Sequence, residues 1–275
     1  MEYLIYYAIS GIAIGLLAGG FGVGGGIIMV PILTFTFYKL GFNPEIIYHI
    51  AIGTSLTCIL FTSFSSLISH AGNKSVDFTL LKDLIPGVIM GAGLGAIFAG
   101  ALKSNELKII FIFFIFVFSI KMFSSKKKPS EGQSTSIHHE IPRYLPFYLH
   151  WLVGTLIGFT SSLVGVGGGV FTSTYMVAMR FSIHNAIGTS SAIGFPIAIA
   201  GTLSYIWIGW ENPNLPSLSL GYIFLPAVFG IVITSFPFAY LGAKLTYKVS
   251  KDRLRKAFSI FLMLMGIGML VSEFY

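Results

Sequence analysis

Long apolar runs, separated by short polar or glycine-rich turns, follow one another along the whole chain. Turn and charge signals divide them into ten segments. The expected segments are 3–18, 24–37, 46–69, 84–102, 109–123, 146–164, 169–179, 183–208, 220–241 and 257–271. A helix needs roughly 20 apolar residues to cross a bilayer, so the pattern predicts an all-α, polytopic integral membrane protein.

The order of these segments repeats. A basic, hydrophilic stretch at 124–145 separates five runs from five more, which predicts a first transmembrane repeat at 1–123, a cytoplasmic linker, and a second repeat at 146–275. The sequence GVGGG occurs once in each half, and so does AIGTS on the following run. Landmarks that recur in the same order indicate an internal duplication.

Orientation follows from lysine and arginine, which gather in the linker and between the ninth and tenth runs. The positive-inside rule places both segments in the cytoplasm, and the four runs between them make the two assignments agree. With five runs per half, the N- and C-termini lie outside, and the repeats have inverted topology in the inner (cytoplasmic) membrane. The first, second and seventh runs are short, so each glycine-broken pair either spans fully or forms a re-entrant hairpin.

Composition supports the membrane prediction. The chain is 55% hydrophobic and only 10% charged, with a mean hydropathy of +0.84, whereas soluble domains are about a quarter charged. The net charge of +7 is confined to loops without a basic stripe, which argues against nucleic-acid binding. The single cysteine, Cys58, forms neither an internal disulfide nor a metal motif, and we expect no cofactor or metal.

The glycine breaks are the main candidate site. Broken backbone inside hydrocarbon must be covered by protein or water, and a helix that starts there presents unpaired amides and partial positive charge, which attract anions. If inverted repeats bring both breaks to the midplane, the two amide clusters form one site for a small anionic substrate. The alternative is close helix packing, which we expect for the spaced glycines of 87–100. The candidate binding glycines are Gly22, Gly24, Gly25, Gly26, Gly165, Gly167, Gly168 and Gly169.

The AIGTS segments add hydroxyl groups. Either these donate hydrogen bonds to a bound oxyanion, or they bond carbonyls of their own helix. His49 and His184, one turn earlier, are candidates for proton coupling, since histidine titrates near neutrality, although each also fits a helix start at the interface. Acidic residues occur only at run ends and in loops, which disfavours a cation pump and suits an anionic substrate. The candidate hydroxyl residues are Thr54, Ser55, Thr189, Ser190 and Ser191.

These motifs together resemble the TauE/SafE sulfite exporter family, also called TSUP, over nearly the whole chain. The resemblance rests on Gly22–Gly26 with Pro31, on Gly165–Gly169, and on the two GTS triplets. It implies a secondary transporter of small sulfur-containing anions, such as sulfite or organosulfonates, and not an enzyme. The second half lacks a proline matching Pro31, so we expect the halves to contribute unequally.

Three alternatives remain beside this interpretation. The protein is an anion channel, a transporter of another oxyanion or a carboxylate, or an intramembrane hydrolase. The hydrolase is disfavoured because His49 and Ser55 are six residues apart on one helix and face different directions. Substrate, direction, coupling ion and oligomeric state stay open.

Overall fold

The computed structural model describes residues 2–21, 25–124, 146–245 and 251–271. These residues form ten helices, and one isolated β-bridge joins Ser219 to Phe224. The helices are α1 (Glu2–Phe21), α2 (Gly26–Lys39), α3 (Ile47–Gly72), α4 (Phe78–Ala101), α5 (Ser104–Ser124), α6 (Phe147–Val164), α7 (Gly169–Ala178), α8 (Ile183–Gly209), α9 (Leu225–Leu245) and α10 (Lys251–Val271). The all-α prediction is confirmed for the described residues, and each predicted apolar run overlaps one helix.

Two helix starts differ from the starts of the predicted runs, each for a local structural reason. The α4 helix begins at Phe78 rather than at residue 84, because Asp77 caps it by accepting a hydrogen bond from the Leu80 N–H at 3.0 Å. The α9 helix begins at Leu225 rather than at residue 220, since the bridge between Ser219 and Phe224 forms a turn before it. Hydropathy alone therefore misplaces a helix start that a capping residue or a preceding turn determines.

Within the described residues, five helices are long and apolar enough to cross a membrane: α3, α4, α6, α8 and α9. The α2 and α7 helices, which follow the glycine breaks, have only 14 and 10 residues. That is shorter than the roughly 20 residues of a full span. Composition and helix length thus agree with a multi-pass membrane protein.

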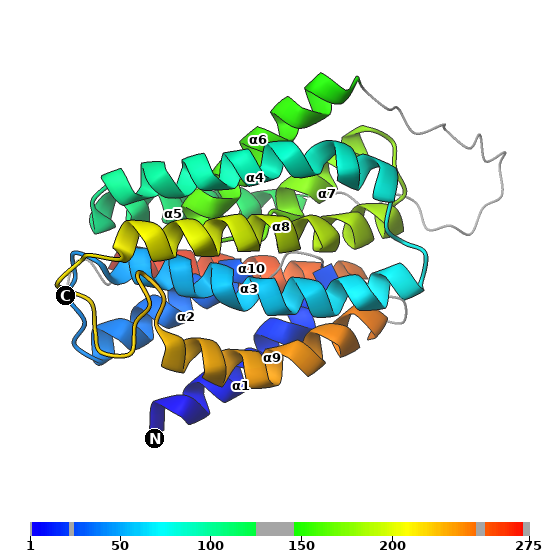
Figure 1. Ribbon diagram of the computed structural model, residues 1–275. Helices are drawn as coiled ribbons and strands as arrows, with labels where there is room; N and C mark the ends of the chain where they lie inside the picture. Colours follow the sequence, from blue (N-terminus) through cyan, green and yellow to red (C-terminus); the bar gives the residue numbers. More distant parts are fainter. Residues whose placement is uncertain (1, 22–24, 125–145, 246–250, 272–275) are drawn as a thin grey trace, which may run out of the picture.

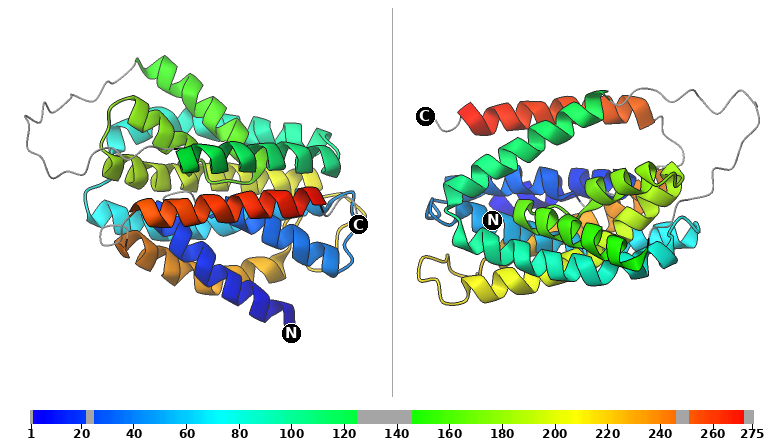
Figure 2. Two further views of the ribbon diagram at one scale, coloured as in Figure 1. Left: turned by 180° about the vertical axis from the view of Figure 1, so that it is seen from behind. Right: turned by 90° about the horizontal axis from the view of Figure 1, so that it is seen from above.

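The helices of the two halves interlock (Figure 1). The α1 helix packs along α9 at one edge of the bundle, and α4 packs along α6 at the opposite edge, with α3 and α8 against each other between them. The α5 and α10 helices pair on one face of the bundle (Figure 2). Exchanging each helix for its counterpart in the other half converts the α1–α9 contact into α6–α4 and the α3–α9 contact into α8–α4.

Glycine makes the edge pairs close. A Cβ atom on Gly87, Gly91 or Gly95 of α4 would collide with a backbone carbonyl of α6. The packing role predicted for the spaced glycines of 87–100 is confirmed at these three positions. Small residues allow such close backbone approach between membrane helices.

Candidate functional site

The two glycine breaks have the same backbone geometry. Gly25 precedes α2 with φ of 75°, and Gly168 precedes α7 with φ of 69°. Both lie in the left-handed region, where a residue with a Cβ atom loses roughly 1–2 kcal/mol. Repeated glycine therefore lets the chain turn sharply into each short helix. Gly22 and Gly24 lie outside the described residues.

The two breaks touch each other. Gly26, the first residue of α2, packs directly on the carbonyl oxygen of Gly165, so a Cβ atom at this position would collide with that oxygen. It would also lie only 2.9 Å from the Cα atom of Val166. Gly165 itself ends α6 with φ of 73°. The sequence placed these segments 139 or more residues apart, and the fold brings them into contact at the centre of the bundle.

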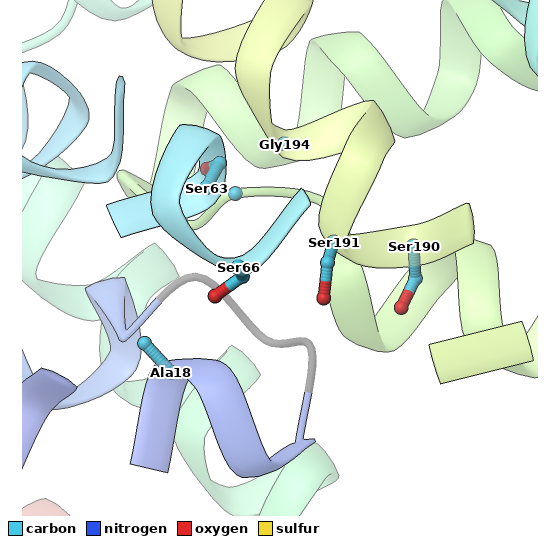
Figure 3. Close-up of a pocket in the computed structure, with 7 residues that line it drawn as sticks. Ala18, Ser63, Ser66, Ser190, Ser191 and Gly194 are labelled. Atoms are coloured by element: carbon cyan, nitrogen blue, oxygen red, sulfur yellow. The ribbon is translucent and has the colours of Figure 1, made fainter. Parts of the chain in front are cut away.

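A small polar pocket lies beside the second break (Figure 3). It is too narrow to admit a water molecule. None of its lining residues carries a charge. They are Ala18, Ser63, Ser66, Gly167, Ser190, Ser191 and Gly194, from α1, α3, the second break and α8.

The threonines of the AIGTS segments hold the start of a helix from the other half. The Thr54 hydroxyl oxygen accepts a hydrogen bond from the Phe224 N–H at 3.0 Å, directly before α9. The Thr189 oxygen accepts one from the Asp77 N–H at 2.8 Å, directly before α4. Both threonines are fully buried. The structure thus places them in matching positions, each joining the two halves.

The serines of these segments differ in how their hydrogens are used. The Ser55 hydroxyl donates to the Gly165 carbonyl at 2.9 Å, and the Ser190 hydroxyl donates to the Ile187 carbonyl at 2.9 Å. Ser191 is 3% exposed, and its oxygen has no hydrogen-bond partner. Of the three serines, Ser191 alone therefore keeps its hydroxyl unpaired, and it lines the pocket.

The two candidate histidines are not equivalent. His49 is buried, with its Nε2 atom 3.1 Å from the carbonyl oxygens of Ala99 and Leu102 at the end of α4, and its ring stacks on Tyr222. His184 is exposed at the start of α8. The structure does not bring them together, and neither lines the pocket.

Sequence reasoning missed the residues that α3 contributes to the pocket. Ser63 and Ser66 are three positions apart and face the pocket together (Figure 3). One turn further, His70 approaches the Gly19 carbonyl at 3.3 Å with its Nε2 atom. The signal was present in the segment TSFSSLISH, whose polar residues recur at helical spacing within an apolar run.

Comparison with known proteins gives a consistent result. The family model described as "Sulfite exporter TauE/SafE" matches residues 7–269. A "Probable membrane transporter protein" of Haemophilus influenzae is 33% identical over 270 residues, which cover 98% of this chain and 99% of that protein. No solved structure matches the chain.

More distant relatives carry similar names. A probable membrane transporter protein of Methanocaldococcus jannaschii is 28% identical over 96% of this chain and 94% of its own length. The probable membrane transporter protein YunE of Bacillus subtilis is 28% identical over 73% of this chain and 79% of its own length.

Proposed function

The chain belongs to the sulfite exporter TauE/SafE family, and we propose that it is a secondary transporter of small sulfur-containing anions, such as sulfite or organosulfonates. The names of its relatives support the general role of a membrane transporter rather than an enzyme. The family description supports a sulfur-containing substrate.

The contact between the two glycine breaks carries the proposed site. Gly25 and Gly168 place the starts of α2 and α7 beside the centre of the bundle, where the first helical amides have no intrahelical acceptor. Two helix starts give two partial positive charges without a cationic side chain. Such a site holds an anion and still releases it.

Hydroxyl groups have a supporting role in this proposal. Because Ser55 and Ser190 already donate to carbonyls, their hydrogens are not available for a bound anion. Thr54 and Thr189 fix the starts of α9 and α4 instead. We therefore assign anion binding to the helix-start amides, which the hydroxyl groups hold in position.

Transport requires the closed centre to open. The pocket beside the second break is too narrow to admit a water molecule, so a carrier that works by alternating access has to widen it to bind its substrate. In this mechanism the α1–α9 and α4–α6 pairs move as units against the α3–α8 pair. The interlocked packing supports this division, since each edge pair joins one helix from each half.

We also propose inverted topology in the cytoplasmic membrane, with both termini outside and the linker in the cytoplasm. The start of α1 and the α8–α9 connection lie at one end of the bundle, whereas the α3–α4 connection and the start of α6 lie at the other (Figure 1). The exchange of helix contacts between the halves also supports this arrangement. Oligomeric state is not part of the proposal.

The alternatives receive less support. The hydrolase interpretation needs Ser55 and His49 to act together, but Ser55 donates to Gly165, and the Nε2 atom of His49 lies at carbonyls of α4. An anion channel differs from a carrier in showing single-channel currents and no saturable counterflow. Proton coupling through His49 or His184 remains a proposal that a pH series of the flux would examine.

Flux into proteoliposomes tests the proposal directly. Radiolabelled sulfite, taurine-like sulfonates and a carboxylate control are offered to purified protein, and we expect saturable uptake and counterflow of the sulfur anions. Gly168→Ala should reduce this flux at least tenfold, because a Cβ atom there both strains the backbone and meets the Ile197 side chain.

Gly41→Ala is the matched control, since Gly41 has φ of 72° and nothing within 4 Å of an added Cβ atom. This variant carries similar backbone strain away from the site and should keep its flux. Absence of sulfur-anion flux in well-folded wild-type protein would contradict the proposed function.

A further inference from the structure

The pocket between α3 and α8 has an unusual lining for a protein that handles anions. Its polar groups are the hydroxyls of Ser63, Ser66, Ser190 and Ser191 together with the backbone of Gly167. A dry pocket of this kind has to satisfy these oxygen atoms or leave them at a cost. The way their hydrogens are used shows which ligand they suit.

At Ser63, an oxygen lone pair rather than the hydroxyl hydrogen is available to this space. The Ser63 hydroxyl donates its hydrogen to the Ile59 carbonyl at 2.6 Å, so only its lone pairs remain for a ligand. A Cβ atom built on Gly194 would lie 2.8 Å from the Ser63 Oγ and 3.0 Å from the Gly167 carbonyl oxygen. The Ser63 hydroxyl of α3 and the Gly167 carbonyl of the second break therefore both lie close to Gly194.

Two further hydroxyls complete the arrangement. The side chains of Ser66 on α3 and Ser191 on α8 also line the pocket (Figure 3). Ser191 is 3% exposed without a hydrogen-bond partner, and Ser66 is 2% exposed. A hydroxyl oxygen can turn its lone pairs toward a cation, and we call the hydroxyls of Ser63, Ser66 and Ser191 together with the Gly167 carbonyl the oxygen cage.

From this cage we propose that the pocket binds a sodium ion. Hydroxyl and carbonyl oxygens replace the hydration shell of monovalent cations, and carbonyls of unwound helix segments, such as that of Gly167, serve this purpose in transporters. Divalent cations are bound with carboxylates, and the lining contains none. The narrow space excludes a hydrated ion and favours sodium over the larger potassium ion.

The position of the cage gives the ion a role in transport. Gly167 lies next to Gly168, the cap of α7, so a bound cation sits beside one of the helix starts proposed to hold the anion. Its charge raises anion affinity there, and the anion raises sodium affinity by the same factor. This coupling rests on the proposed function, whereas sodium binding does not.

Thermal unfolding of the full-length protein in detergent tests the binding. A ligand of the folded state raises the unfolding midpoint with its concentration. We expect a midpoint that rises with NaCl relative to choline chloride at equal chloride concentration and ionic strength, and a clearly smaller rise with KCl. Equilibrium binding of ²²Na⁺ to the wild-type protein should saturate over the same concentration range.

Variants locate the site. Ser191→Ala should shift the sodium dependence at least tenfold toward higher concentration, and Gly194→Ala should abolish it by filling the cage. Ser204→Ala is the control, because Ser204 lies on the same helix and donates to the Ala200 carbonyl away from the pocket. If Ser191→Ala does not fold, Ser66→Ala takes its place.

Equal midpoints of the wild type in sodium, potassium and choline, or an unchanged sodium dependence in the variants, would overturn the inference. Suppose that anion flux continues undiminished with choline on both sides and that sodium has no effect on stability. This result rejects the sodium site and leaves the proposed function standing. Saturable sodium binding in protein that moves no sulfur anion rejects the proposed function while leaving the sodium site standing.

Discussion

At the scale of single residues, glycine serves two purposes at the centre of this protein. Gly25 and Gly168 adopt left-handed backbone before α2 and α7. Gly26 instead has ordinary helical backbone. Only glycine fits at this position, because the Gly165 carbonyl lies where a Cβ atom would be. The first purpose is a property of local geometry, and the second exists only where two distant segments meet.

The contact of Gly26 can be tested by its smallest enlargement. Gly26→Ala places a methyl group against a backbone oxygen that cannot rotate away, so we expect a loss of about 1–3 kcal/mol or more in stability. Thermal unfolding in detergent and the amount of monodisperse protein measure this loss.

Gly72→Ala is the control for this substitution. Nothing lies within 4 Å of a Cβ atom added to Gly72, which ends α3, and alanine is a better helix former than glycine. This variant should keep or slightly raise the midpoint. A Gly26→Ala protein as stable as the wild type would show that the two breaks are not in contact.

At the scale of helices, the GT pair of each AIGTS segment is a docking point for the other half. Beside Thr54, Gly53 packs against the Tyr222 carbonyl, and beside Thr189, Gly188 packs against the Ser75 carbonyl. Glycine admits the incoming backbone, and threonine accepts its N–H. The motif thus fixes where α9 and α4 start, which positions the two edge pairs.

Removing these acceptors should weaken both docking points. Thr54→Val and Thr189→Val keep the shape of the side chain but leave a buried N–H without its partner, which costs about 1–3 kcal/mol each. Because the two sites lie on different helices, the effects should add in the double variant. Unfolding midpoints of single and double variants measure this.

Thr160→Val is the matched control, since Thr160 only donates to the Leu156 and Ile157 carbonyls of its own helix. Its free energy of unfolding should change by less than about 0.5 kcal/mol, as for other sites away from buried networks. Equal losses of stability in Thr54→Val, Thr189→Val and Thr160→Val would contradict a special role of the GT pairs.

At the scale of the whole molecule, the helices of the two halves of the chain are interleaved instead of side by side. The strongest packing partners of α1 and α4 are α9 and α6, which belong to the other half. Any motion that opens the centre therefore moves helices of both halves together. This arrangement explains how two glycine breaks from different halves share one central position.

The proposed orientation can be measured with cysteine labelling, because the native Cys58 is buried and should give little background. Asn214→Cys, between α8 and α9, should react with a membrane-impermeant maleimide from outside the cell. Ser136→Cys, in the linker, should react only after the membrane is inverted or opened. Labelling of the two positions from the same side would contradict the proposed topology.

The sequence alone was sufficient for the number and class of the elements. Hydropathy and glycine punctuation depend on neighbours along the chain and on the bilayer, so ten helices and two matching halves could be read without any long-range contact. Family membership likewise followed from local motifs such as GVGGG and GTS, and the match over residues 7–269 confirms it.

Only the tertiary structure decided what each polar group does. Thr54 and Ser55 are adjacent and chemically alike, yet one accepts from Phe224 and the other donates to Gly165, both more than a hundred residues away. Ser63 and Ser66 gained their place in the pocket from α8 and the second break. Hydrogen-bond partners and enclosed space arise from which segments meet, and residue order along a helix does not specify this.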